Sequence, residues 1–257
     1  MSTQSLGEQT VDLLARLGCV NDLTADSGGE ERAADLLEEF FAGLPVSIER
    51  VTPHPGRTTL VVTVEGSAPH GDGTPLTLVG HTDVVPVDEA KWTRDPFGAQ
   101  IEDGVMWGRG TVDMLHLTAA MAVITRQVAR RAQKSEPPAR SLVFVAAADE
   151  EARGGLGVPW IGENLPDAFP WDAALSEMGG AHIHGRRGGD SVVVVVGEKG
   201  AAQRRLHIRG DAGHGSVPLG RTSAVERLAQ VSAALSSARW PTASDEVWAG
   251  FVRAFEF

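Results

Sequence analysis

Acidic side chains and one histidine follow three apolar segments of the sequence. The segments are LTLVG at 76–80, LVFVAAA at 142–148 and WDAALS at 171–176. The polar groups directly after them are His81, Asp83, Asp149, Glu150, Glu151 and Glu177. A further carboxylate, Asp113, precedes a helical pattern. If the apolar segments are parallel neighbours in one sheet, these side chains meet at its carboxyl edge, where open α/β sheets bind ligands.

The chemistry of this set indicates a metal site. One imidazole with several carboxylates and no thiolate suits zinc, manganese or cobalt. Asp113, Glu151 and Glu177 carry three negative charges, which together with a bridging hydroxide balance two divalent cations. Taken singly, each residue has a simpler interpretation: Asp113 is a typical helix N-cap, and DEE at 149–151 is typical of a solvated helix start. Their joint occurrence at successive strand ends favours the metal site.

Alternating strand and helix patterns must position these residues. The strand patterns cover 46–51, 58–66, 76–80, 141–148 and 171–177, and the helical patterns cover 10–18, 27–44, 114–133 and 156–165. Ser27 and Glu30 have the spacing of a capping box at the start of the second helix. The run at 99–110 predicts a hairpin that turns at Asp103–Gly104. The alternation predicts an α/β fold with a mainly parallel sheet over about the first 190 residues.

The alternation of strand and helix patterns ends near residue 190. HGRRGGD at 184–190 indicates a linker-like turn, and the segments 191–200 and 201–210 predict two adjacent strands. A helix is predicted over 221–238. We therefore expect two domains: an α/β metal-binding domain over 1–198 and the start of a second, α+β unit over 199–257.

Length, charge and cysteine content exclude several classes of protein. The chain has 257 residues, enough for one large domain or a domain and a half. Its formal net charge of −11 does not fit a nucleic-acid-binding or basic membrane-binding protein. No run approaches the roughly 20 apolar residues of a membrane span, and the segment before Cys19 lacks the features of a signal peptide. Because Cys19 is the only cysteine, we expect a cytoplasmic protein without membrane or nucleic-acid partners.

Four motifs occur in order along the chain. They are GHTDVVP (80–86), WGRGTVDM (107–114), ADEEARGGLG (148–157) and GEKGAAQRRLHIRGDAGHGSVP (197–218). Together with Glu177, they resemble the motifs of the dinuclear-zinc peptidase and deacylase family, which includes acetylornithine deacetylase, succinyl-diaminopimelate desuccinylase, aminoacylase and glutamate carboxypeptidase. The resemblance implies a three-layer α/β/α catalytic domain with a mainly parallel mixed sheet, followed by the start of an α+β lid, or dimerisation, domain.

The resemblance also implies a set of metal ligands. His81 and Glu177 would bind one ion, Glu151 would bind a second ion, and Asp113 would bridge both. The peptide bond between Asp113 and Met114 would be cis. The implied cofactors are two divalent metal ions, zinc in the first place, with cobalt or manganese as alternatives.

Three further residues have catalytic roles by the same resemblance. Asp83 would orient the imidazole of His81 from behind. Glu150 would act as general base toward a metal-bridged hydroxide and then pass the proton to the leaving amine. His214, in the lid, would donate to the oxyanion, in this family often across a dimer interface. The implied activity is hydrolysis of an amide bond in a small peptide or an N-acyl amino acid by a homodimer.

The sequence departs from the family pattern in two places. Where the family usually has DMKGG, this chain has DMLHL at 113–117. We interpret His116 within it as a packed or solvent-facing residue rather than an extra ligand. The family has a final metal-binding histidine after the lid, whereas here the chain ends at Phe257 and no histidine follows His214. We therefore expect a C-terminally truncated product or a fragment.

Two functions from different classes remain open at this point. The first is a metal-dependent amidohydrolase. The second is an inactive remnant of this family that acts at most as a metal-binding or dimerisation module. A serine hydrolase is disfavoured because GHGSV lacks the G-x-S-x-G pattern, and a nucleotide-binding loop is disfavoured because GRGTVD lacks the lysine and spacing of a phosphate loop.

Overall fold

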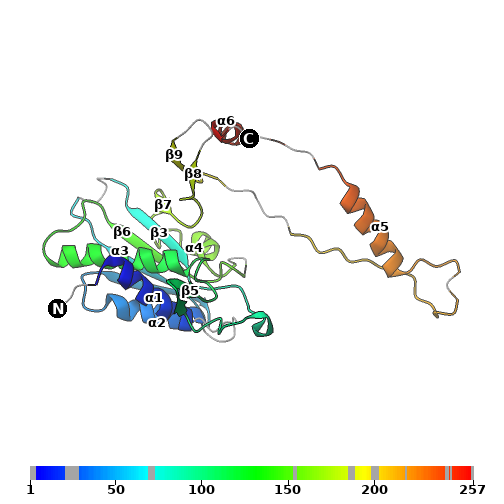
Figure 1. Cartoon of the computed structure of the whole chain (residues 1–257), viewed down its shortest axis with the longest axis horizontal. Coiled ribbons are helices and arrows are strands. Elements are labelled where there is room, and N and C mark those ends of the chain that lie inside the picture. The colour runs from blue at the N-terminus through cyan, green and yellow to red at the C-terminus, as the bar shows by residue number, and fades with distance from the viewer. Residues whose placement is uncertain are drawn as a thin grey trace. The chain divides into compact units, whose positions relative to one another are not determined.

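A computed structural model of the chain separates into two compact units, Met1–Glu177 and Met178–Phe257, which we call unit 1 and unit 2. Figure 1 labels the helices and strands of both units. The structure describes residues 4–20, 29–68, 73–152, 155–184, 189–197, 203–217, 219–240, 243 and 245–255. The sequence predicts a boundary between two functional domains after residue 198. The division into units does not test this boundary, so it stays a prediction.

A five-stranded sheet with strand order β1-β2-β6-β3-β7 forms the centre of unit 1. Its strands are β1 (Ser47–His54), β2 (Arg57–Val64), β3 (Leu76–His81), β6 (Leu142–Ala147) and β7 (Ala174–Leu175). β3 is parallel to both β6 and β7, whereas β2 is antiparallel to both β1 and β6. The sheet is therefore mixed and only partly parallel. The antiparallel β1–β2 pair follows from its two-residue connection, since a parallel pair needs a long crossover.

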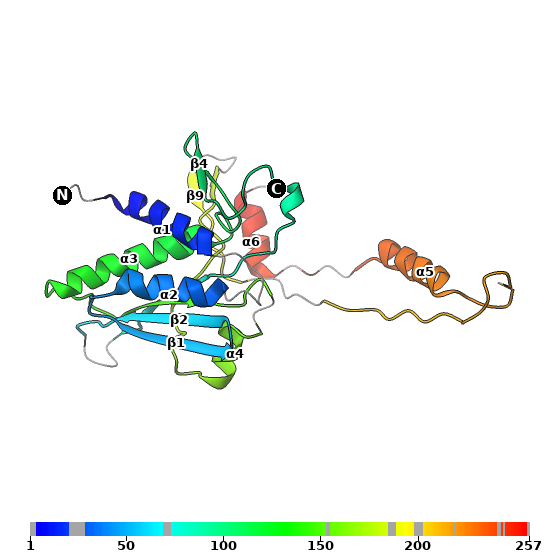
Figure 2. The ribbon, with the colours of Figure 1, turned by 90° about the horizontal axis from the view of Figure 1, so that it is seen from below.

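Helices cover both faces of this sheet, as the α/β prediction required. α1 (Leu6–Val20), α2 (Gly29–Phe41) and α3 (Leu115–Gln133) lie on one side, and α4 (Val158–Asn164) lies on the other (Figure 2). Alternate residues of a strand face opposite sides, so β6 contributes Phe144 to the three-helix side and Val145 to the α4 side. The predicted α/β fold class is confirmed, with the layer order α/β/α.

The register of β3 against β6 brings the predicted site residues to one edge. His81, the last residue of β3, pairs with Ala147, the last residue of β6. The next amide, that of Thr82, donates to the Ala147 carbonyl at 2.8 Å. Gly80 allows α3 to pack closely here, because a Cβ at this position would lie 2.5 Å from Oγ1 of Thr118. The segments that follow β3 and β6 therefore leave the sheet side by side.

Short elements connect the sheet to α3. A 3₁₀ helix, η2 (Glu89–Lys91), is followed by the hairpin of β4 (Gln100–Glu102) and β5 (Val105–Trp107). The hairpin turns at Asp103–Gly104, as predicted, and both of these residues have positive φ, 51° and 79°. Asp and Gly are among the residues that tolerate this conformation best.

Unit 2 contains a small hairpin and two helices in its described part. They are β8 (His182–His184), β9 (Asp190–Val192), α5 (Ala224–Ser237) and α6 (Glu246–Phe255). His184 and Asp190, the two ends of the predicted linker-like turn, pair with each other across β8 and β9, and residues 185–188 between them lie outside the described residues. The helix predicted over 221–238 is confirmed as α5.

Of the two strands predicted over 191–200 and 201–210, only Ser191 and Val192 lie in a strand, and residues 198–202 lie outside the described residues. β9 ends at Val192, and the described residues 193–197 and 203–210 form no strand. The valine run has strand propensity, but Val194 and Val196 are largely exposed and have no neighbouring strand to pair with in the described part of the chain. Propensity alone does not form a strand, because stabilisation comes from cross-strand contacts and burial.

Among the described residues, none of the helices combines the length and the apolar character needed to cross a bilayer.

Candidate metal centre

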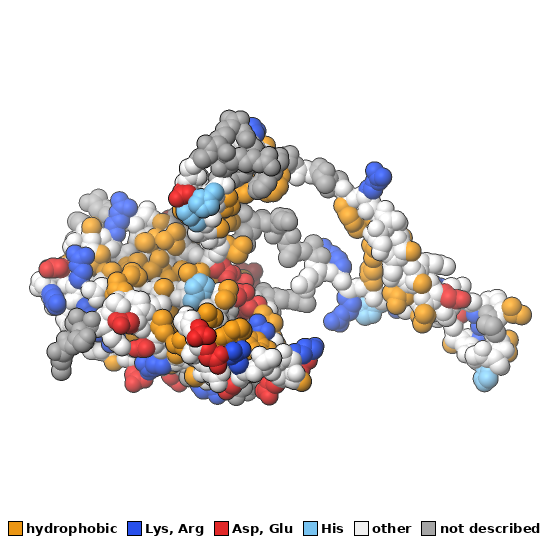
Figure 3. Space-filling view, viewed as in Figure 1, with side chains coloured by type: hydrophobic (Ala, Val, Ile, Leu, Met, Phe, Trp, Pro, Cys, Tyr) orange, Lys and Arg blue, Asp and Glu red, His pale blue; other side chains and the backbone are white. Residues whose placement is uncertain are grey.

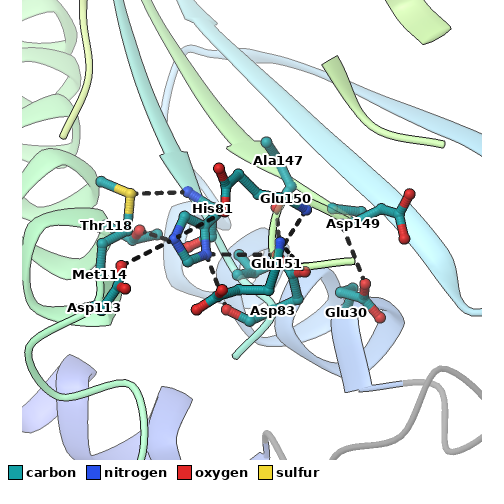
Figure 4. A network of polar contacts seen from close by, with 12 residues as sticks. Glu30, His81, Asp83, Asp113, Met114, Thr118, Ala147, Asp149, Glu150 and Glu151 are labelled. Carbon is teal, nitrogen blue, oxygen red and sulfur yellow. Dashed lines mark hydrogen bonds and ion pairs between the residues drawn. The ribbon is translucent and has the colours of Figure 1, made fainter. Parts of the chain in front are cut away.

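The imidazole of His81 lies at the centre of the polar cluster at the edge of β3 and β6 (Figure 4). Its Nδ1 is 2.9 Å from the carbonyl oxygen of Asp83 and 3.4 Å from Oδ1 of the same residue. Because a carbonyl oxygen only accepts, Nδ1 carries the proton in this hydrogen bond. In the neutral ring the lone pair is then on Nε2, which is the atom available to a metal.

Three carboxylates surround Nε2 of His81. Oδ1 of Asp113 is 3.4 Å away, Oε2 of Glu177 is 3.8 Å away, and Oε2 of Glu150 is 3.9 Å away. Ligand atoms of His81, Asp113 and Glu151 also lie within 4.8 Å of one another. The structure therefore brings together all of the residues expected to bind metal, from four separate segments of the chain.

Asp83 connects the ends of two strands. Its Oδ1 accepts the amide of Glu150 at 3.1 Å, and its Oδ2 accepts the amide of Glu151 at 2.9 Å. The same carboxylate faces Nδ1 of His81. Asp83 thus holds the imidazole in a fixed position relative to residues 149–151, which we call the acidic turn after β6. The sequence suggested only the contact with the imidazole, since backbone donors more than 60 residues away leave no local signal.

A buried ion cluster lies behind the acidic turn. Arg57 of β2 contacts Glu30 of α2, and its Nε is 3.4 Å from Oδ1 of Asp149. Oε1 of Glu30 also accepts the amide of Asp149, and Oδ2 of Asp149 accepts the amide of Leu156 at 2.8 Å. Burial raises the pKa of Glu30, and the guanidinium of Arg57 opposes this shift. The cluster fixes the chain on either side of Glu150 and Glu151.

Two sequence interpretations change because of this ion cluster. Glu30, expected to take part in a capping box, is buried and uses its carboxylate on Arg57 and on the Asp149 amide; Ser27, its proposed partner, lies outside the described residues. Asp149 was one of the acidic groups expected at the sheet edge, but its carboxylate contacts Arg57 and the Leu156 amide. No pattern in the sequence identified Arg57.

The start of α3 fixes the other side of the imidazole. The Asp113–Met114 peptide bond is cis, as the resemblance implied. The Met114 side chain is buried, and its Sδ accepts the His81 amide at 3.3 Å. Oγ1 of Thr118 donates to the His81 carbonyl at 2.8 Å. The backbone of His81 is thereby bound to the same helix that follows Asp113.

The electrostatics of the cluster suit cations. Burial by itself lowers the pKa of His81, but hydrogen bonds to Asp83 and the charges of Asp83 and Glu150 outweigh it and raise the pKa to about 9. Burial raises the pKa of Glu151 and of Glu177, and neighbouring carboxylates raise both further. Oε1 of Glu151 is buried without a hydrogen-bond partner. Carboxylate oxygens and one imidazole are the donor set of a zinc, cobalt or manganese site, and the excess negative charge favours a bound cation.

The sequence singled out two further histidines, His116 and His214. His116 is half-buried, its Nδ1 has no hydrogen-bond partner, and it belongs to none of the groups of close metal-binding atoms in the described residues. His214 is in unit 2, where its Nδ1 is 2.7 Å from Oγ of Ser216. A role of His214 at the substrate carbonyl stays a prediction.

Comparisons of the sequence with known proteins agree on one family. The sequence profile described as "Peptidase family M20/M25/M40" matches residues 77–256. The chain is 31% identical over 169 residues to succinyl-diaminopimelate desuccinylase of Legionella pneumophila strain Corby, and 32% identical over 169 residues to that of strain Paris. Each of these alignments covers 64% of this chain but only 42% of the relative.

Solved structures with a similar fold were also found. An M20 family metallo-carboxypeptidase, Sso-CP2 of Sulfolobus solfataricus, superimposes with a TM-score of 0.51 and 21% identity, covering 72% of this chain and 39% of that one. Human carnosine dipeptidase 1 superimposes with a TM-score of 0.51 and 20% identity, covering 69% of this chain and 41% of that one. At these identities the similarity concerns the fold.

Proposed function

The chain belongs to peptidase family M20/M25/M40, and from this premise we propose that it is a metal-dependent hydrolase of an amide bond in a small peptide or an N-acyl amino acid. The family expected from the motifs is thereby confirmed, whereas the activity is our proposal. One observation supports it most: Nε2 of His81 faces Asp113, Glu150 and Glu177, while Nδ1 is held by Asp83.

We assign the metal ligands as follows. His81 and Glu177 would hold one divalent ion, Glu151 would hold a second, and Asp113 would contribute to both. When bound, such ions supply Lewis acidity toward a carbonyl group and toward a water molecule. Zinc is the expected metal, with cobalt and manganese as alternatives.

The protein side chains supply positioning and proton transfer. Glu150 takes a proton from the attacking water at its carboxylate and passes it to the leaving amine nitrogen, as the new C–O bond forms and the C–N bond breaks. Its carboxylate is 52% exposed, so it can reach a substrate from the solvent side. Asp83 keeps Nε2 of His81 directed at the cluster. His214 donates to the developing oxyanion.

The remaining assignments follow the family. We propose that residues 199–257 belong to a lid that forms a homodimer, and that the protein acts in the cytoplasm. The chain spans 42% of the length of the desuccinylases that it matches, so the activity of the whole protein is part of this proposal. The names of the relatives make N-succinyl amino acids and dipeptides the first substrates to test.

Metal analysis and kinetics on the same preparations test the proposal. The purified chain, loaded with zinc or cobalt, is assayed for metal content and for hydrolysis of N-succinyl and N-acetyl amino acids and dipeptides. We expect about two ions per chain at this centre, and Glu150→Gln should keep the metal while lowering kcat by about 10² to 10⁴. His81→Gln should lower both metal content and turnover. Glu163→Gln, on the exposed face of α4, is the matched control and should change neither.

The outcomes separate the two functions. Turnover that survives Glu150→Gln would show that this carboxylate is not the base. Bound metal with no turnover on any substrate would instead support the second candidate, a metal-binding module without activity. Absence of both metal and turnover would refute the assigned centre.

A further inference from the structure

A second group of metal-binding side chains lies in unit 2, on the hairpin of β8 and β9. His182 and His184 are two residues apart on β8. Successive side chains of a strand point to opposite faces, so these two share one face. Asp190, on β9, pairs directly with His184 across the hairpin. The three side chains therefore lie on one side of a two-stranded ribbon.

Their ligand atoms converge. Oδ1 of Asp190 is 2.6 Å from Nδ1 of His184, and Oδ2 of the same carboxylate is 3.4 Å from Nε2 of His182. The two imidazole centroids are 5.1 Å apart with the rings edge to face, and one ligand atom from each residue lies within 4.8 Å of the other two. Figure 3 shows pale blue histidine and red acidic side chains exposed together over this hairpin.

Two imidazoles and one carboxylate are a common donor set for zinc and for other divalent transition metals. We propose that the β8–β9 hairpin binds one such ion through His182, His184 and Asp190, with solvent in the remaining coordination positions. The side chains of these residues are 52%, 77% and 62% exposed, which leaves room for water ligands and free entry of the ion. This site shares no residue with the centre around His81, and it does not depend on the proposed hydrolase activity.

A simpler interpretation is an ion pair between Asp190 and a protonated His184. That pair accounts for the 2.6 Å contact. It does not require a second imidazole on the same face, directed at the other oxygen of the same carboxylate. A metal ion uses all three groups at once. The two interpretations differ in what happens when zinc is added.

Equilibrium dialysis of the full chain against zinc, followed by metal analysis, distinguishes them. The chain with the His182→Ala and His184→Ala substitutions together should bind one ion fewer than the unsubstituted chain. Asp190→Asn should weaken zinc binding at this site by roughly tenfold or more, which corresponds to about 1.4 kcal/mol. His207→Ala removes another exposed histidine of unit 2 and should leave the stoichiometry unchanged.

Repeating the dialysis with His81→Gln separates the two centres. In that background the hairpin ion should remain, and it should disappear when the two hairpin histidines are also replaced. Because all three hairpin residues are exposed, loss of folding is easily checked by the circular dichroism of each variant. An unchanged zinc stoichiometry in the double alanine variant overturns the proposal and supports the ion pair alone.

Discussion

The two units of this chain differ in what holds their elements in place. Unit 1 contains every buried residue of the described chain, from Leu13 of α1 to Phe169 after α4. None of the described residues of unit 2 is buried, and large apolar side chains such as Val225 and Leu235 of α5 are exposed (Figure 3). Helices form in both units, so a helix here does not by itself indicate a core.

The difference shows which secondary-structure elements are determined by their own residues and which depend on tertiary packing. α5 is defined by its own residues, because Ser223 and Glu226 form a complete capping box. α2, β2 and β6 are defined by contacts among segments far apart in the sequence, which also hold the acidic turn of the metal centre. The candidate metal centre, which needs fixed geometry, lies in unit 1, whereas the proposed hairpin site of unit 2 needs only its own two strands.

The largest expected difference between the units comes from matched core truncations. Phe144 is fully buried in β6 and lies near Phe41, with ring centroids 6.2 Å apart. Phe144→Ala should lower the free energy of unfolding by about 4 kcal/mol, since it removes a large side chain and leaves a cavity. Leu235→Ala in α5 should change it by less than about 0.5 kcal/mol. Urea unfolding followed by circular dichroism measures both, and equal losses would contradict the comparison.

The buried ion cluster should give the next largest effect. Arg57→Met leaves the carboxylates of Glu30 and Asp149 buried without their cation. Removing one partner of a buried pair costs about 3 to 5 kcal/mol, and we expect a loss of unfolding free energy in this range. Arg50→Met breaks an exposed pair with Asp35 and Glu38 and should cost under about 1 kcal/mol. Similar losses in the two variants would show that the cluster adds little to stability.

The positions of the residues in the candidate metal centre could be predicted from the sequence further than the contacts that support them could. Apolar runs that end near His81, Glu150 and Glu177 are local patterns, and parallel pairing of β3 with β6 and with β7 was enough to bring their ends together. The position of Asp113 could be predicted because this residue precedes the helical pattern of α3. These positions needed only strand and helix periodicity, which short windows of sequence contain.

The rest depended on partners chosen by tertiary packing. Arg57 and Glu30 are 27 residues apart, and Asp83 binds amides 67 and 68 residues away. Such contacts leave no periodic pattern in the sequence. Strand propensity does not specify which strand lies next to which. The sequence therefore did not reveal that β2 pairs antiparallel with β6, or that the valines after Val192 have no partner strand among the described residues.

The pH dependence of stability should differ between histidines of the two units. Because the folded-state pKa of His81 is raised to about 9 from an ordinary value near 6.5, its protonation stabilises the metal-free chain below about pH 6.5 and this stabilisation is lost as pH rises toward 9. The raised pKa values of Glu151 and Glu177 act in the same direction as they ionise. In EDTA, we expect about 2 to 3 kcal/mol less stability at pH 9 than at pH 6.

Thermal unfolding across this pH range provides the measurement. His81→Gln should flatten the dependence, and His207→Gln, at an exposed position of unit 2, should leave it as it is. Zinc should stabilise the chain more at pH 8 than at pH 6, because binding must displace the proton from His81. A flat profile in the unsubstituted chain would contradict the raised pKa.

The smallest expected effect lies in unit 2 and tests whether its helix stands alone. Ser223→Ala removes the side chain that accepts the Glu226 amide, which should cost α5 about 1 kcal/mol. Because the described part of unit 2 has no buried core, this loss should appear as roughly fivefold faster amide exchange in the first turn of α5, with an unchanged midpoint for the unfolding of unit 1. Ser236→Ala, in the last turn, serves as the control and should not speed exchange, since alanine is the better helix former. If Ser223→Ala instead lowered the midpoint of unit 1, α5 would have to be coupled to that core, and the contrast between a locally defined unit and a packed one would fail.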